Sequence, residues 1–424
     1  MNEKLLVISH YFPPVPGVGG RRWAKFVKYL SKGNSEEVFV ISAENTVKDL
    51  NSSFSEELKG VNFTQICLPS NYPKYLEFLE FWKPTLWRKI MFRFQLFFLK
   101  RNTQGNYWDF SVNWGPHFKK TIPDIIRKKG ITSLIVSGPP YRYTKFALSL
   151  KKEFPDLQII IDYRDPWNDF NDPFPISEER HEFERNLEKE VLESVDKIIT
   201  VSNFQKSLIQ KNVPNHAPLY VVPNGFDADD SFYISKLSKE KSDKINLTHF
   251  GTLHILKEYY WLPFLEALVK LKLSKPELYK KLEVNFVGYC PQEIEEWIKT
   301  NELAINIQGL IEPHKAFQEL AKADIALWFK YDGSPGDFAT KFGDYIAFKK
   351  FMWTFTVKGE VSEYIEANKI GQVFYRSNQN LKETIYAALL GLEDHNNYKF
   401  NPEYDNSKLT ISKLAENLIE VIED

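Results

Sequence analysis

The sequence of 424 residues has little cysteine, and its two cysteines, Cys67 and Cys290, lie far apart in no metal-type spacing. We therefore expect a reduced, cytoplasmic protein. No uninterrupted apolar run reaches the roughly 18 residues that a membrane-spanning helix requires. The apolar run at residues 5–8 is too short for a signal peptide and lacks a cleavage site.

Neither sign of charge is in excess, because the formal net charge at pH 7 is −1. This balance gives no support for a general nucleic-acid-binding protein. Hydrophobic residues make up 43% and charged residues 26%, which is typical of a folded chain rather than a disordered one. The length exceeds that of one ordinary core and predicts two domains of about 200 residues each.

Short apolar segments alternate with helical patterns, which predicts βαβ units in open parallel sheets. Helical patterns at residues 23–30, 118–129 and 178–194 lie between the expected strands of the first half. The strands are expected at residues 5–8, 38–41, 133–136, 159–161, 197–201, 245–250, 282–287, 305–308, 325–328, 351–355 and 372–375.

The pattern breaks at "VVPNGFDADDSF" and then restarts, which indicates a domain boundary. We expect an α/β protein with two Rossmann-like, doubly wound domains, at residues 1–222 and 223–405, and a C-terminal helix at 406–424. Ligands of such sheets bind beyond the carboxyl ends of the strands. Two of these edges facing each other would enclose a cleft.

The loop "SHYFPPVPGVGGRR" follows the first expected strand and ends in Arg21 and Arg22. Its glycines could bring backbone N–H groups close to a phosphate at the start of a helix, although a plain turn has the same composition. The spacing is not G-x-G-x-x-G, and no acidic residue stands where a dinucleotide ribose would need it. A nicotinamide-dependent dehydrogenase is therefore disfavoured.

Charged residues also follow expected strands in the second half. Lys257 lies shortly after the strand-end Gly251, where a bound anion would offset the unfavourable position of a cation at a helix start. In "DGSPGDFATKFGDYIAFKK", Lys341 and Asp344 would share one face of a helix, and Asp337 precedes them. Lysine can hold phosphate and a carboxylate can bind ribose hydroxyls, but solvated surface charges would give the same spacing.

In the first half, the strand in "IIIDYRDPWNDF" is followed by charged residues. Arg164 and Asp165 would face the ligand crevice at the carboxyl end of that strand. A structural Asp–Arg pair is the alternative.

The chain resembles the retaining, nucleotide-sugar-dependent glycosyltransferases of family 4 over nearly its whole length. The most specific matches are "VVPNGFD" and "GLIEPHKAFQELAKADI", and "SGPPYRYTKFALSLKKEFPDLQIIIDYRDPW", "FGTLHILK" and "TKFGDYIAFKK" accompany them. The resemblance implies the GT-B fold and no cofactor or metal. It also implies transfer of a sugar from a nucleotide-diphosphate donor to a lipid-linked or polysaccharide acceptor, in cell-surface polysaccharide biosynthesis.

The resemblance also implies the roles of individual residues. Arg164 or Asp165 would touch the transferred sugar, and Lys257 would contact the diphosphate. Lys341 matches a lysine of the branch that handles bacterial surface sugars, and Asp344 falls at the ribose-binding position. The other implied donor-binding residues are Gly19, Gly20, Arg21, Gly251, Thr252, Asp337 and Leu310, the last of which would flank the base.

Two departures from the family pattern leave alternatives open. Thr252 replaces the arginine that follows the strand-end glycine, and the paired glutamates of E-x7-E are represented by Asp337 and Asp344. A non-catalytic, sugar-nucleotide-binding relative would tolerate both changes. Another GT-B enzyme, such as an epimerase or an inverting transferase, would need a base in the cleft, and His10 is the candidate for it.

Aromatic residues make up 15% of the sequence and gather in an insertion around residues 72–102. Between Phe81 and Arg101 there are six basic residues and no acidic one, and Trp87, Met91, Phe94 and Phe98 fall on one helical stripe. Such a segment suits the surface of an anionic membrane at the inner face of the plasma membrane. A helix packed on the core of the first domain is the alternative.

Overall fold

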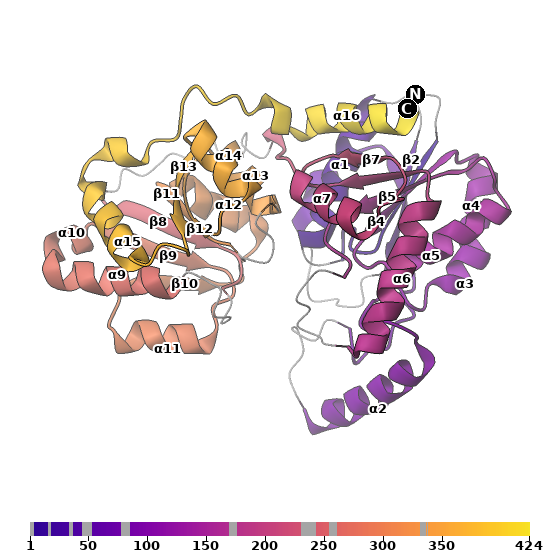
Figure 1. Ribbon diagram of the computed structural model, residues 1–424, viewed down its shortest axis with the longest axis horizontal. Coiled ribbons are helices and arrows are strands. Elements are labelled where there is room, and N and C mark those ends of the chain that lie inside the picture. Colours follow the sequence, from indigo (N-terminus) through magenta and orange to yellow (C-terminus); the bar gives the residue numbers. More distant parts are fainter. Residues whose placement is uncertain are drawn as a thin grey trace. The chain divides into compact units, whose positions relative to one another are not determined.

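The computed structural model describes residues 4–15, 18–33, 37–44, 53–77, 85–168, 176–229, 243–253, 261–330, 336 and 338–424. The chain divides into two compact units (Figure 1). Unit 1 comprises Met1–Pro223 and Leu414–Asp424, and unit 2 comprises Asn224–Lys413.

The described residues of unit 1 form a seven-stranded sheet in the order β3-β2-β1-β4-β5-β6-β7, and each neighbouring pair is parallel. The strands are β1 (Leu5–Ser9), β2 (Val38–Ala43), β3 (Phe63–Leu68), β4 (Ser133–Gly138), β5 (Gln158–Tyr163), β6 (Lys197–Thr200) and β7 (Leu219–Val221). The helices are α1 (Arg21–Gly33), α2 (Leu86–Asn102), α3 (Gly115–Lys119), α4 (Thr121–Lys129), α5 (Arg142–Leu148), α6 (Glu178–Ser194) and α7 (Asn203–Asn212).

Unit 2 contains a six-stranded sheet in the order β10-β9-β8-β11-β12-β13, again with parallel neighbours. The strands are β8 (Ile245–Phe250), β9 (Leu282–Val287), β10 (Ile305–Gly309), β11 (Ile325–Phe329), β12 (Phe351–Thr356) and β13 (Gly371–Tyr375). The helices are α9 (Trp261–Ser274), α10 (Pro276–Lys280), α11 (Gln292–Thr300), α12 (Pro313–Lys322), α13 (Thr340–Ala347), α14 (Glu360–Asn368) and α15 (Leu381–Leu390).

Both faces of each sheet are covered, as expected for parallel sheets. In β11 of unit 2, Leu327 packs in one apolar cluster with α9 and α15, while Ala326 and Trp328 pack in another with α13 and α14. In β1 of unit 1, Leu6 and Ile8 join a cluster with α4 and α6, and the alternate residues are equally buried. This coverage confirms the α/β fold class predicted from the alternation of segments.

The expected strands all occur in the structure, with ends displaced by at most two residues. Two strands, β3 and β7, were not predicted. Both lie at sheet edges and are only partly buried, so they lack the continuous apolar run of a central strand. The helix expected at 118–129 is divided at Lys120 into α3 and α4.

The C-terminal helix α16 (Ile411–Glu423) belongs to unit 1 from Leu414 onward. Lys197 of β6 donates from Nζ to the carbonyl of Val421 at 2.8 Å, and the side-chain amide of Gln158 donates to the carbonyl of Ile422 at 3.1 Å. Leu418 and Ile422 are fully buried. The sequence pattern predicted this helix but not the surface on which it packs.

A buried ion pair joins α1 to the end of β5. The guanidinium of Arg22 lies 3.3 Å from Asp162 Oδ1 and donates to the carbonyls of Val222 at 2.7 Å and Pro223 at 3.0 Å. Asp162 Oδ2 also accepts from Trp23 Nε1 at 2.7 Å and from Ser137 Oγ at 2.8 Å. Burial lowers the pKa of the Arg22 guanidinium, and the Asp162 carboxylate opposes that shift.

We predict that Asp162→Ala strongly destabilises the protein, because it leaves the Arg22 guanidinium buried without its counter-charge. Removing one partner of a buried pair costs about 3–5 kcal/mol of unfolding free energy. A urea titration should show this loss. Asp124→Ala is the control, since it breaks an Asp124–Arg127 pair in which both side chains are 52% exposed, and its midpoint should match that of the wild type. Equal midpoints for all three proteins would contradict the prediction.

Candidate functional site

In unit 2, three glycines lie where β8, β9 and β10 end or just beyond. Gly251, Gly288 and Gly309 have φ angles of +107°, +134° and +67°. Their backbones are linked across the carboxyl ends of these strands. The Gly251 amide donates to the Val287 carbonyl and the Gly288 amide donates to the Gly309 carbonyl, both at 2.8 Å. A Cβ on Gly288 would lie 2.3 Å from the Gly251 carbonyl oxygen. At these three positions the carboxyl end of the sheet therefore exposes backbone without side chains, as close approach of a ligand to the main chain requires.

Lys341, at the start of α13, reaches the same edge. Its ammonium donates to the Phe250 carbonyl at 2.7 Å, and a Cβ on Gly251 would lie 2.8 Å from Nζ. Burial lowers the pKa of Lys341 to about 8, and the nearby Asp344 carboxylate opposes the shift. A partly desolvated cation beside bare backbone can hold an anion such as a phosphate.

Asp344 lies one turn after Lys341 on α13, as the spacing predicted. The helix is held close to the segment that opens unit 2, because a Cβ on Gly343 would lie 2.8 Å from the Gly225 carbonyl oxygen. The "VVPNGFD" and "TKFGDYIAFKK" motifs thus pack against each other through their glycines. Asp344 is partly buried.

The remaining predicted residues of unit 2 are placed differently. Thr252 is exposed, and Leu310, directly after β10, is 74% exposed. Lys257 and Asp337 lie outside the described residues, so their roles stay predictions. The sequence analysis missed Lys330, which is only 5% exposed and directly follows β11 beside the point where the strand order reverses. The sequence feature that could have identified Lys330 is a charged residue directly after an apolar strand.

In unit 1, the side chain of Arg164 connects the loops that follow β1 and β4. It donates to the Gly19 carbonyl and, at 3.4 Å, to the Pro139 carbonyl. Its Nε lies 3.5 Å from Asp165 Oδ2, and the Asp165 side chain is 56% exposed. The strand order of unit 1 reverses between β1 and β4, so Arg164 lies at the position where ligands of doubly wound sheets bind.

In the loop that follows β1, contacts within the loop itself require one of the glycines. A Cβ on Gly20 would lie 1.6 Å from the Tyr11 carbonyl oxygen, so any side chain there would disrupt the loop. Arg21 is nearly buried, with Nε 3.9 Å from a Glu57 carboxylate oxygen. The donor-binding roles of Gly19, Gly20 and Arg21 stay predictions.

His10, the candidate base of the alternative enzymes, is buried at the end of β1. Its ring lies 4.9 Å from Tyr11, 5.5 Å from Trp114 and 6.1 Å from Phe110, centroid to centroid. Burial lowers the pKa of His10 to about 3. An imidazole that is neutral and enclosed by aromatic rings is poorly suited to accept a proton from a ligand.

We predict that Gly288→Ala destabilises unit 2 more than Gly309→Ala does. Both positions have positive φ, where a side chain costs about 1–2 kcal/mol. At Gly309 nothing lies within 4 Å of the new Cβ, whereas at Gly288 the Cβ would also collide with the Gly251 carbonyl. Thermal unfolding of the two variants measures the difference. Equal losses would show that the edge of the sheet relaxes freely.

The comparisons with known proteins concern the fold. No protein-family model and no curated protein matches the sequence. Among solved structures, sucrose-phosphate synthase from Thermosynechococcus elongatus is similar, with a TM-score of 0.64 and 14% identity, over 100% of this chain and 98% of that one.

Two further solved structures match over almost their whole length. A UDP-forming trehalose-phosphate synthase from Burkholderia xenovorans has a TM-score of 0.58 and 13% identity, over 100% of this chain and 99% of that one. UDP-GlcNAc 2-epimerase from Neisseria meningitidis, bound to UDP-GlcNAc, has a TM-score of 0.54 and 14% identity, over 99% of both chains. With two parallel-sheet α/β units arranged along its sequence as in these enzymes, the chain has the GT-B fold.

Proposed function

We propose that this protein is a glycosyltransferase that moves a sugar from a nucleotide-diphosphate donor to a lipid-linked or polysaccharide acceptor, with retention and without a metal. The observation that carries the proposal lies at the carboxyl ends of the strands of unit 2, where Lys341 lies beside the backbone of Gly251. Sucrose-phosphate synthase and the trehalose-phosphate synthase share the fold, which supports the same class of donor.

The chemistry of the transfer needs charge stabilisation more than a nucleophile. Breaking the bond between the sugar and the diphosphate builds negative charge on the leaving phosphate, and a preorganised cation lowers the barrier. Lys341 supplies such a cation, and Asp344 on the same helix is suited to the ribose hydroxyls. By the family resemblance, Arg164 or Asp165 contacts the transferred sugar and Lys257 adds a second cation.

An epimerase is the second candidate, because UDP-GlcNAc 2-epimerase has the same fold. That candidate is disfavoured by the environment of His10, which is 1% exposed and whose pKa is lowered to about 3 by burial. The donor chemistry at the edge of unit 2 would serve either enzyme. Only a transferase passes the sugar to a second molecule, so an assay of acceptor products separates the two.

We predict that Lys341→Ala lowers turnover of the correct nucleotide-sugar by about a hundredfold or more, since removing one charge-stabilising donor costs roughly 3–4 kcal/mol of barrier. A panel of UDP-, GDP- and ADP-sugars, assayed for donor hydrolysis and transfer, identifies the substrate. Lys322→Ala is the control, because that side chain is 62% exposed and paired with Glu319. Absence of turnover with every donor would favour a non-catalytic binding protein.

We also predict that the affinity for UDP or another cognate nucleoside diphosphate falls as the pH rises from 7 to 9. The pKa of Lys341 is lowered to about 8 by burial, so its charge is lost within this range. Titration calorimetry of the wild type should show the decline, and Lys341→Ala should show a weaker and flatter profile. A flat profile in the wild type would argue that Lys341 does not contact the phosphates.

We further propose that α2 binds an anionic membrane surface. Leu86, Trp87, Ile90, Phe94, Phe97 and Phe98 are between 45% and 77% exposed. The opposite face, with Phe92, Leu96 and Leu99, packs against Tyr72, Leu76 and Tyr107. Helix α2 is therefore anchored through one apolar face and exposes another, so the core-packing alternative accounts for only half of it.

The positive charge of α2 favours anionic lipid as the ligand that its exposed face contacts. The helix carries Arg88, Lys89, Arg93, Lys100 and Arg101 and no acidic residue. Basic residues near a charged bilayer contribute about 1 kcal/mol each, and aromatic side chains insert at the headgroup boundary. None of the helices among the described residues is both long and apolar enough to span a membrane.

We predict that the protein binds anionic vesicles at low salt and that Phe94→Ser/Phe97→Ser weakens partitioning by about tenfold or more. Lys89→Glu/Arg93→Glu should have a similar effect, since it reverses two of the attractive charges. Leu273→Ser is the control, because Leu273 is 78% exposed on α9 of unit 2 and should not matter. Vesicle sedimentation measures each. A wild type that ignores anionic vesicles at low salt would refute the proposal.

A further inference from the structure

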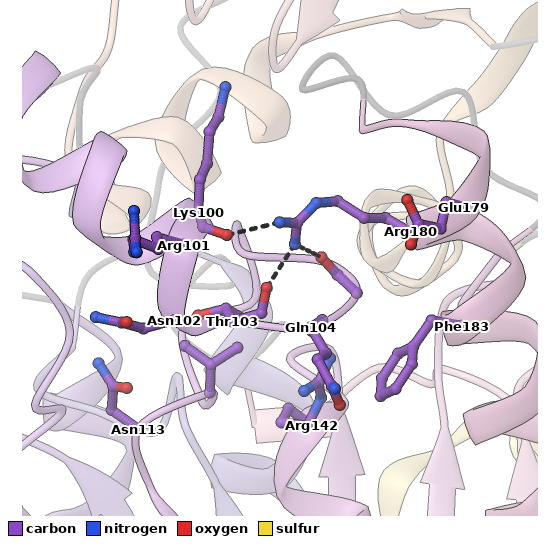
Figure 2. Close-up of a pocket in the computed structure, with 12 residues that line it drawn as sticks. Lys100, Arg101, Asn102, Thr103, Gln104, Asn113, Arg142, Glu179, Arg180 and Phe183 are labelled. Atoms are coloured by element: carbon purple, nitrogen blue, oxygen red, sulfur yellow. Dashed lines mark hydrogen bonds between the residues drawn. The ribbon is translucent and has the colours of Figure 1, made fainter.

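A cavity of about 780 Å³ lies in unit 1 beside the C-terminal end of α2. Its walls come from that helix end, the segment that follows it, the start of α5 and the first turns of α6 (Figure 2). The family resemblance assigns no role to any of these residues, and the cavity is distinct from the strand ends described above.

The lining of the cavity is strongly basic. Lys100, Arg101, Arg142 and Arg180 contribute four positive charges, and Glu179 is the one acidic residue among the residues that line it. The lining therefore carries a net charge of +3 (four minus one), in a protein whose formal net charge is −1. Such a concentration of cations predicts an anionic ligand.

Two of the arginines are held firmly. Arg180 donates to the carbonyls of Lys100 at 2.6 Å, Thr103 at 2.6 Å and Gly105 at 2.7 Å, which fixes the end of α2 to the start of α6 (Figure 2). Arg142 donates to the Gln104 carbonyl at 2.9 Å and to Glu184 at 2.5 Å. The wall of the cavity is therefore fixed before any ligand arrives.

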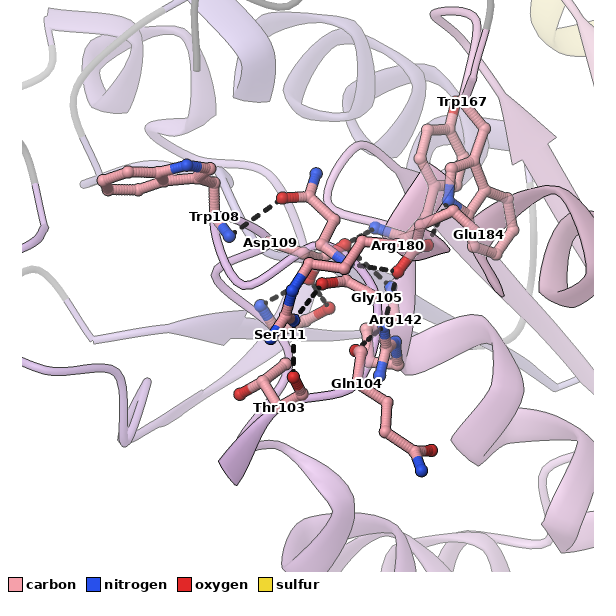
Figure 3. A network of polar contacts seen from close by, with 12 residues as sticks. Thr103, Gln104, Gly105, Trp108, Asp109, Ser111, Arg142, Trp167, Arg180 and Glu184 are labelled. Carbon is pink, nitrogen blue, oxygen red and sulfur yellow. Dashed lines mark hydrogen bonds and ion pairs between the residues drawn. The ribbon is translucent and has the colours of Figure 1, made fainter. Parts of the chain in front are cut away.

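Glu184 organises the wall further. Its carboxylate also accepts from the backbone amide of Asn106 at 2.6 Å. It accepts from Trp167 Nε1 at 2.8 Å as well (Figure 3). Gly105 has a φ of +68°, and a Cβ there would lie 2.1 Å from Glu184 Oε1. Since Glu184 neutralises Arg142 and Arg180 is occupied by carbonyls, the two cations best placed to meet a ligand are Lys100 and Arg101, both exposed.

The exposed apolar face of α2 leads directly to these two cations. Arg101 follows Phe94, Phe97 and Phe98 by seven, four and three residues, so it continues the same helical stripe. An amphiphile lying along the phenylalanines would therefore carry its polar group to Arg101 and the cavity. A free anion would gain nothing from that apolar stripe.

We propose that this cavity binds the phosphate group of a lipid whose hydrocarbon chain lies along the exposed face of α2. Lys100 and Arg101 contact the phosphate, while Arg142 and Arg180 hold the wall in place. The inference rests on the membrane association proposed above and extends it from general attraction to a defined phosphate site. A membrane phospholipid and a phosphate-linked acceptor share this chemistry.

The test uses dihexanoyl phosphatidic acid, a short-chain lipid that can be titrated in monomeric form into the full-length protein by calorimetry. We expect saturable binding that Lys100→Gln/Arg101→Gln weakens by about tenfold or more, the change that 1.4 kcal/mol produces. The matched control is Lys119→Gln/Lys120→Gln, which removes two exposed charges of unit 1 away from the cavity and should bind as the wild type does. Long-chain phosphatidic acid and a phosphate-linked prenol, compared in micelles, distinguish the two lipid sources.

Inorganic phosphate and dihexanoyl phosphatidylcholine are the two comparison ligands of this experiment. Inorganic phosphate should bind at least about tenfold more weakly because it lacks the chain, and the zwitterionic lipid should bind weakly because its charge is neutralised. The proposal would be overturned if inorganic phosphate or dihexanoyl phosphatidylcholine bound as tightly as dihexanoyl phosphatidic acid. It would also be overturned if both double variants lost equal affinity, or if the wild type showed no saturable binding. Donor hydrolysis by the same variants reports separately on the glycosyltransferase.

Discussion

The organisation of unit 1 depends on the ion pair between Arg22 and Asp162, which is buried between the start of α1 and the end of β5. A buried guanidinium is tolerated only when its charge and its N–H groups are satisfied. Asp162 supplies the charge, and the carbonyls of Val222 and Pro223 accept hydrogen bonds from the guanidinium. The pair thus fixes the start of α1, the end of β5 and the chain that leaves β7. Arg164, two residues after Asp162, donates a hydrogen bond to the Gly19 carbonyl.

The two units use one architecture with different chemistry at the carboxyl ends of their strands. In unit 2 that edge is made of glycine backbone with the partly desolvated ammonium of Lys341 beside it. In unit 1 it is made of arginine and carboxylate, together with aromatic rings around a buried His10. Bare backbone with a cation suits the diphosphate of a donor, whereas charged side chains suit hydroxyl groups. This contrast supports our proposal that unit 2 binds the donor nucleotide.

Helix α2 is fixed to unit 1 through one of its two apolar faces. One face packs on Tyr72, Leu76 and Tyr107, and Arg180 of α6 binds the carbonyls at the helix end. The other face remains exposed with its phenylalanines, and the last turn places Lys100 and Arg101 at the basic cavity. Because only one side is packed, the second apolar side stays exposed, and it is this side that we propose contacts a lipid.

The two doubly wound units could be predicted from the amino-acid sequence, because a buried parallel strand is a continuous apolar run and such runs can be recognised in the sequence. It also placed Lys341 and Asp344 on one helical turn, since that spacing is local. The edge strands β3 and β7 were not predicted, because half-buried strands carry no such run. Which charged groups contact each other could not be predicted and emerged from the folded chain. The contacts of Arg22 with Asp162, of Arg180 with Lys100 at the end of α2 and of Lys341 with Phe250 join residues that are 80 or more positions apart. Pairings over such distances depend on packing, for which a linear pattern has no signal.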